Sequence, residues 1–201
     1  MAGRCGGPQR DGSDLRPAIR MDVEKGLELS LIGMDDAPEL FSVVDSNRMH
    51  LREWLAWLDG TKSIEDEISF ISMSLEEYEK REGILYAIRL DGNLIGTISL
   101  NWIDWGNKGC GVGYWLAENQ IGNGYVTKSC IRLMEHCFDD LNLHRFVLEA
   151  AVENVASCEV AERIGMRLEG ITKDREWLYD HYVDAKLYAI TKPEWDEKRS
   201  K

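Results

Sequence analysis

The stretch ENQIGNGYVTKS, residues 118–129, decides how this chain is interpreted. It lies between a strand-like run, 108–117, and a run whose apolar residues repeat at helical spacing, 125–141. A helix N-terminus offers unpaired N–H groups and a positive dipole end, and glycines let a phosphate approach the backbone. The sequence therefore allows either a packing turn or an anion site whose donors are the amides of Gly122, Asn123, Gly124, Tyr125 and Val126.

Two familiar nucleotide loops do not fit this stretch. A Walker loop needs glycine directly before Lys128-Ser129, and Thr127 stands there instead. The dinucleotide fingerprint GxGxxG begins at Gly122 but also finds Thr127 in place of its third glycine. A nucleotide hydrolase and a dinucleotide-dependent enzyme are therefore both disfavoured.

The rest of the chain alternates between strand and helix patterns. Period-2 runs or turn signals such as Asp91-Gly92 predict seven strands, and apolar residues at helical spacing predict four helices. The predicted strands are 27–33, 83–90, 93–105, 108–117, 144–152, 166–174 and 182–191, and the predicted helices are 34–59, 63–81, 125–141 and 154–165. We expect an α/β fold with a mixed, mostly antiparallel central sheet, formed by one domain over 21–201.

Composition limits the partners and the cellular compartment that we expect for this domain. Residues 1–20 are rich in Gly and Arg and lack apolar periodicity, so we expect a disordered tail. The formal net charge of -12 disfavours a nucleic-acid partner, and no apolar run is long enough to span a membrane. Five scattered cysteines and no metal-ligand spacing predict a reduced, cytoplasmic protein without a metal site.

Several ordered motifs resemble the GNAT superfamily of acetyl-CoA-dependent N-acetyltransferases. VGYWLAENQIGNGYVTKS is followed by a helix, a strand, NVASCEVAERIGMRLEG and EWLYDHYVDAKLYAI. These, with NRMHLREWLAWLD near the start, are similar to the branch that acetylates the N-termini of ribosomal proteins. The resemblance implies a GNAT-like fold, acetyl-CoA as cosubstrate and an amine acceptor, most simply a protein N-terminus; a homodimer is compatible with it.

The resemblance also implies roles for particular residues. Backbone groups of Tyr114, Trp115 and Leu116 would lie beside the thioester and pantetheine, and Asn154 would contact the pantetheine arm or position a water. The tyrosine that commonly serves as acid in the superfamily is replaced by Ala161. In the ribosomal-protein branch its task falls to the serine matched by Ser157, and the general base to the glutamate matched by Glu176.

Each assignment has a purely structural alternative. Asn154 is a natural helix cap, Ser157 could be an ordinary first-turn residue, and Glu176 is one of 36 acidic residues. The acceptor also stays open, because a small amine such as an aminoglycoside or polyamine is an alternative to a protein N-terminus. A CoA-binding module without turnover is the alternative to an enzyme. An α-amine has a pKa about 2.5 units below that of lysine, so one carboxylate base suits it better.

Overall fold

The structure is a computed structural model that describes residues 15–200. Within this range, eight strands form one sheet in the order β1-β2-β3-β4-β5-β6-β8-β7, and every neighbouring pair is antiparallel except β5–β6. The strands are β1 (Arg20–Glu24), β2 (Leu27–Leu31), β3 (Ile84–Leu90), β4 (Asn93–Asp104), β5 (Gly109–Leu116), β6 (Arg145–Ala151), β7 (Arg167–Leu178) and β8 (His181–Thr191). The predicted mixed, mostly antiparallel sheet is confirmed, with one strand more than expected.

Between residues 15 and 200, six α-helices accompany the sheet, where we expected four. They are α1 (Ala37–Ser46), α2 (Arg48–Arg52), α3 (Ile64–Lys80), α4 (Tyr125–Glu135), α5 (Val155–Arg163) and α6 (Lys192–Arg199). Short 3-10 turns are η2 (Met34–Asp36), η3 (Leu58–Gly60) and η4 (Glu118–Gln120), and a π-helical turn, η5 (His136–Asp140), extends α4. None of the helices within residues 15–200 is both long and apolar enough to cross a bilayer.

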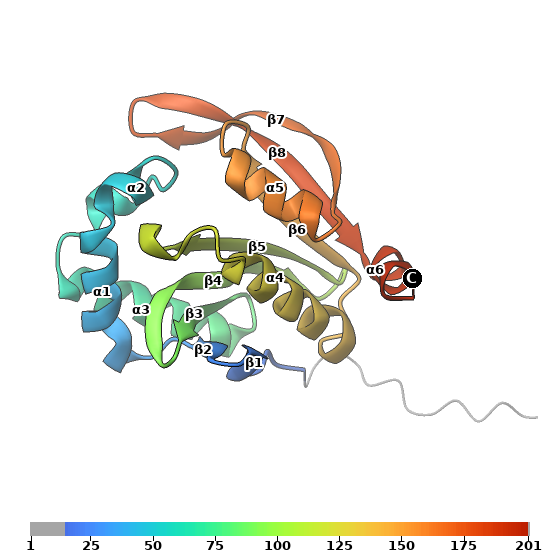
Figure 1. Cartoon of the computed structure of the whole chain (residues 1–201), viewed down its shortest axis with the longest axis horizontal. Coiled ribbons are helices and arrows are strands. Elements are labelled where there is room, and N and C mark those ends of the chain that lie inside the picture. Colours follow the sequence, from blue (N-terminus) through green and yellow to red (C-terminus); the bar gives the residue numbers. More distant parts are fainter. Residues whose placement is uncertain (1–14, 201) are drawn as a thin grey trace, which may run out of the picture.

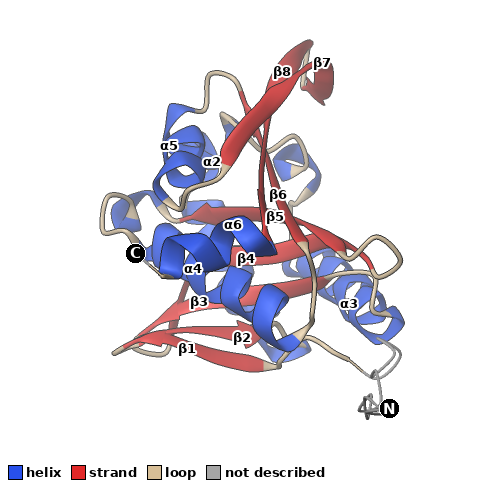
Figure 2. Cartoon of the chain, turned by 90° about the vertical axis from the view of Figure 1, so that its right-hand side faces the viewer, coloured by secondary structure: helices blue, strands red, loops and turns tan. Residues whose placement is uncertain are grey.

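The helices cover the two faces of the sheet separately (Figures 1 and 2). Along β3, Ile84, Tyr86 and Ile88 join the cluster packed under α4 and α5, whereas Leu85 and Ala87 join the cluster under α1 and α3. This alternation follows from the two-residue period of a strand. The sheet therefore lies between two layers of helices.

Local signals in the sequence explain several element ends. Asp91 and Gly92 have φ values of 48° and 86°, the left-handed pair that a tight hairpin turn requires. Ser63 and Asp66 form the expected capping box at the start of α3. The backbone N–H of Ser157 donates to Asn154 Oδ1 at 3.1 Å, which confirms the predicted cap of α5.

Three predictions need correction. The helix expected over 34–59 is instead η2, α1, α2 and η3, because the chain turns at Asn47, where φ is -116° and ψ is 15°. β7 continues to Leu178 and forms one long hairpin with β8. The charged end of the chain is not a plain tail: Thr191 and Glu194 cap α6, and Trp195 is buried.

Residues 15–20, expected to belong to a disordered tail, lie packed on the domain. Arg20 begins β1, the Tyr86 hydroxyl donates to the Ala18 carbonyl at 2.7 Å, and the Ala18 N–H donates to His136 Nε2 at 2.9 Å. These contacts join segments more than 60 residues apart, so local sequence gives no sign of them. The predicted tail over 1–14 lies outside the described residues.

Candidate active site

The glycine loop joins the end of β5 to the start of α4. Gly122 and Gly124 have φ values of 81° and 76°, in the left-handed region where a side chain is strained. A Cβ added at either position would meet nothing within 4 Å, so the space in front of this backbone is open. Gly124 is the N-cap of α4, and no side chain caps that end. The first-turn amides are thus free to serve an anion, as the sequence predicts.

The remaining members of the loop support this geometry. The Asn123 side chain turns back to donate to the Gln120 carbonyl at 3.2 Å. Tyr125 and Val126 are half-buried and pack against the core beneath α4. An open turn at an uncapped helix start is a geometry that can bind an anion through main-chain N–H groups.

Lys128 and Ser129 do not form a nucleotide site. Lys128 Nζ pairs with Glu24 Oε1 of β1 at 2.7 Å, and Ser129 is fully buried. Neither side chain faces the open side of the loop. The structure therefore agrees with the rejection of a Walker loop on sequence grounds.

β5 and β6 separate next to this loop. Their parallel pairing covers only Gly109–Val112 against Arg145–Leu148, while β5 continues to Leu116 paired with β4 alone. Successive residues of a strand turn their backbone groups to alternate edges, and the Trp115 carbonyl lies against Gly96 of β4. The backbone groups of Tyr114 and Leu116 therefore face away from β4, beyond the last residue of β5 that pairs with β6. We call this opening the splay; Figure 2 shows β5 and β6 diverging. An extended arm such as pantetheine can pair with a free strand edge.

The first turn of α5 borders the splay on the α4 side. The Tyr114 hydroxyl donates to the Ser157 carbonyl at 3.5 Å, and Ser157 N–H donates to Asn154. Burial raises the pKa of Tyr114 far above its usual range, so its hydroxyl stays a donor. The structure thus brings Tyr114, Asn154 and Ser157 together. Ala161 is fully buried, so the position of the missing tyrosine is filled by core packing.

Glu176 lies on the opposite face of the sheet from α5. Trp115 packs with the layer of α1 and α3, and the pairing of strands places Val147, Ala189, Val183 and Glu176 on that same face. Glu176 is exposed on β7, which β8 separates from β6. Its neighbours Trp177 and Tyr182 pack edge to face at 4.8 Å. Ser157 and Glu176 therefore lie on opposite faces of the sheet.

One contact at this end of the molecule has no counterpart among the sequence predictions. The Tyr179 hydroxyl at the tip of the β7–β8 hairpin donates to the Leu55 carbonyl at 2.6 Å, across 124 residues of chain. Arg52 covers the same ring at 3.8 Å. The available sequence signal is the pair Tyr179-Asp180 at a two-residue turn, where Asn-Gly is the usual choice.

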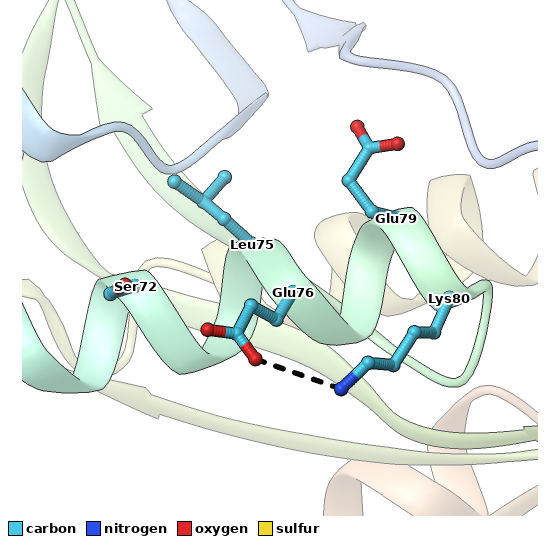
Figure 3. Close-up of a pocket in the computed structure, with 5 residues that line it drawn as sticks. All are labelled: Ser72, Leu75, Glu76, Glu79 and Lys80. Atoms are coloured by element: carbon cyan, nitrogen blue, oxygen red, sulfur yellow. Dashed lines mark ion pairs between the residues drawn. The ribbon is translucent and has the colours of Figure 1, made fainter.

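A surface hollow on α3 is separate from these elements. It is lined by Ser72, Leu75, Glu76, Glu79 and Lys80, with Lys80 Nζ and Glu76 Oε2 3.6 Å apart (Figure 3). All five residues come from one helix, and none of them borders the splay. Among residues 15–200, no group of three His, Cys, Asp or Glu side chains is arranged to hold a metal ion.

Comparison with known proteins agrees with this geometry. The acetyltransferase (GNAT) domain model matches residues 27–167. The ribosomal-protein-serine acetyltransferase of Escherichia coli strain K12 is 32% identical over 167 residues, which cover 83% of this chain and 93% of that protein.

Two solved structures share the fold. The ribosomal L7/L12 α-N-protein acetyltransferase RimL in complex with coenzyme A has a TM-score of 0.84 and 30% identity, with 87% of this chain and 99% of that chain covered. The microcin C7 self-immunity acetyltransferase MccE in complex with acetyl-CoA and AMP has a TM-score of 0.81 and 29% identity, with 84% and 94% covered. With a free strand edge beside an open glycine loop, this chain belongs to the GNAT family, as an acetyl-CoA-dependent N-acetyltransferase of the group that includes the ribosomal-protein acetyltransferases.

Proposed function

We propose that this enzyme acetylates a protein N-terminal α-amine, as the names of its ribosomal-protein relatives suggest. The observation that carries the proposal is the placement of Glu176 on the face of the sheet opposite α5 and Ser157. A base on one side of the splay and a proton donor on the other suit an amine and a thioester that meet between them. The acceptor would then enter from the side of α2 and the β7–β8 hairpin.

In this proposal the main chain holds the cosubstrate. The amides of residues 122–126 bind the diphosphate, the free edge of residues 114–116 binds the pantetheine arm, and Asn154 contacts that arm or a water. Acetyl-CoA supplies the acetyl group as a thioester. Glu176 accepts the proton of the attacking amine, directly or through a water. The Ser157 hydroxyl donates to the leaving thiolate, because the position of the usual tyrosine is occupied by Ala161.

The basicity of the acceptor favours an α-amine. An α-amine has a pKa of about 7.7–8.0 and a lysine side chain about 10.4, so deprotonating lysine costs roughly 3.4 kcal/mol more. Glu176 is exposed, and a single carboxylate in water is a modest base. It can therefore assist the α-amine more effectively than the lysine side chain.

Thiol release from acetyl-CoA, followed by mass spectrometry of the product, tests the acceptor. The panel pairs peptides beginning with Ser or Ala with the same sequences blocked at the N-terminus and carrying an internal lysine. We expect modification of the free N-termini only. Turnover of spermidine or an aminoglycoside without any peptide activity would refute the protein acceptor, and binding without turnover of any amine would refute catalysis.

Glu176→Gln tests the base. We expect kcat to fall at least about 100-fold, within the range typical of general base catalysis, with little change in the KM for acetyl-CoA. The matched control is Asp174→Asn on the same strand, an exposed carboxylate with φ of 48°, a conformation that asparagine tolerates. Equal activity of parent and Glu176→Gln would remove Glu176 from the mechanism.

Ser157→Ala tests the proton donor. The backbone N–H and carbonyl of Ser157 make its hydrogen bonds with Asn154 and Tyr114, so alanine keeps the first turn of α5 intact. We expect a lower kcat with acetyl-CoA, and a smaller loss with an acetyl thioester whose leaving thiol is more acidic, because such a thiolate needs less protonation. The same loss with both donors would argue for a role other than proton donation.

A homodimer and a cytoplasmic location also stay predictions. Sedimentation equilibrium of the full chain tests the first, and fractionation of cells that produce it tests the second. Neither enters the chemical argument above.

A further inference from the structure

Tyr179 adopts an unusual backbone conformation for its size. It lies with Asp180 in the two-residue turn between β7 and β8, and its φ is 60°. Glycine and asparagine tolerate this region, whereas a bulky aromatic residue there is strained. A turn needing only to reverse the chain would be better served by asparagine or glycine. The side chain must therefore contribute something that offsets the strain.

The Tyr179 side chain bridges two segments distant in sequence. Its hydroxyl donates to the Leu55 carbonyl at 2.6 Å, in the turn between α2 and η3. The guanidinium of Arg52 lies 3.8 Å from the ring centroid, and Arg52 is itself held by Asp59 through two hydrogen bonds of 3.0 and 2.9 Å. Burial raises the pKa of Tyr179, so the hydroxyl remains a donor near neutral pH.

The bridge is placed where the hairpin extends beyond the sheet. β6 ends at Ala151, which faces Ala185 of β8, so the hairpin from Glu176 to Val183 continues past the last residue of β6. Figure 1 shows the tip of this hairpin reaching over α2. A two-stranded ribbon without further sheet contacts is only marginally ordered, so a contact at its tip controls its position.

We propose that Tyr179 is a positioning residue, whose contacts with Leu55 and Arg52 dock the β7–β8 hairpin on the α2–η3 segment and fix Glu176 beside the splay. This inference rests on the proposed role of Glu176. The Tyr179 hydroxyl and ring can hold the hairpin in place, whereas asparagine or glycine at the same turn position would make neither contact.

Two substitutions separate positioning from turn formation. Tyr179→Phe removes only the hydroxyl, and we expect kcat to fall about threefold. Tyr179→Asn suits the left-handed backbone but removes both contacts, so we expect kcat to fall about tenfold or more, without a lower Tm and with an unchanged KM for acetyl-CoA. Lys173→Met is the control: it removes an exposed ion pair with Asp184 on the same hairpin, and we expect parent activity.

Non-additivity tests whether Tyr179 acts through Glu176. In the Glu176→Gln background, we expect Tyr179→Asn to cause less than about a twofold further loss, because residues acting as a unit are not additive. A full additional tenfold loss would show that Tyr179 acts by another route. Parent kcat in Tyr179→Asn would overturn the inference even if the proposed acetylation is correct.

Hydrogen exchange provides a readout that does not depend on turnover. In the full chain, amides of residues 176–183 should exchange at least about tenfold faster in Tyr179→Asn and Arg52→Met than in the parent, while amides of β3 and β4 stay unchanged. If no peptide is acetylated by the parent, the proposed function fails, yet faster exchange would still establish the docking contact. Unchanged exchange in both variants would overturn the docking itself.

Discussion

Glu67 gives a prediction whose magnitude follows from its burial. It lies in the first turn of α3, only 3% of its surface is exposed, and Oε1 has no hydrogen-bond partner among the described residues. Burial, with a smaller contribution from Asp66, raises the pKa of Glu67 from 4.5 to about 7, although Arg48 opposes the shift. The carboxylate form is thus disfavoured in the folded protein.

The pH dependence of stability follows from this shift. Below pH 4.5 both states hold the proton, so the group costs nothing there. As pH rises, the unfolded chain ionises first, and the free energy of unfolding falls until the folded carboxyl ionises near pH 7. The shift corresponds to roughly 3 kcal/mol in full, most of which lies between pH 5 and pH 8.

Glu67→Gln removes this titration. We expect the difference in unfolding free energy between variant and parent to grow in favour of the variant by roughly 2 to 3 kcal/mol from pH 5 to pH 8, whatever its constant offset. Urea unfolding at half-unit pH steps measures it, and contributions from other groups cancel in the difference. The matched control is Glu65→Gln on the same turn, whose carboxylate stays in water in both states. A flat difference for Glu67→Gln over this range would refute the reasoning.

Three further predictions concern the cofactor loop and α5. Gly124→Ala should raise the KM for acetyl-CoA about tenfold. The control is Gly92→Ala, which has a similarly positive φ and equally open surroundings and should lower only the Tm. Equal KM values in the two variants would contradict the anion site. Lys128→Met should change that KM less than about threefold, because its ion pair is half-exposed, and a 30-fold loss would restore a phosphate role for the lysine. Asn154→Ala should lower the free energy of unfolding by about 1 kcal/mol because the helix cap is lost, whereas Asn154→Asp keeps the cap and should not lower it. A raised KM for acetyl-CoA in Asn154→Asp would then report a contact of the side chain with the cofactor, separately from capping.

Local chemistry made much of the fold predictable. The Asp91-Gly92 turn, the Ser63 capping box and the Asn154 cap each act within a few residues, so their letters suffice to locate them. The same is true of the glycine loop, since positive φ at Gly122 and Gly124 is a property of the local chain. Sequence therefore located the glycine loop and most of the strands of the sheet.

Contacts between distant segments were not predictable in this way. β1 and the segment before it are ordered by Tyr86 and His136, and the chain turns at Asn47 although helical spacing continues through it. The six-helix count differs from expectation for a similar reason: α6 depends on the burial of Trp195. Periodicity reports which face is apolar, and says nothing about which remote segment will cover it.

The sequence by itself determined the family, the glycine loop and the identity of the candidate chemical groups. Only the tertiary structure decided that Ser157 and Glu176 lie on opposite faces of the sheet, because strand register and sheet order set which side a residue takes. It also decided that Lys128 is engaged with Glu24 and that Tyr179 reaches Leu55. A residue type gives the chemistry that is available, whereas the path of the chain decides which groups meet.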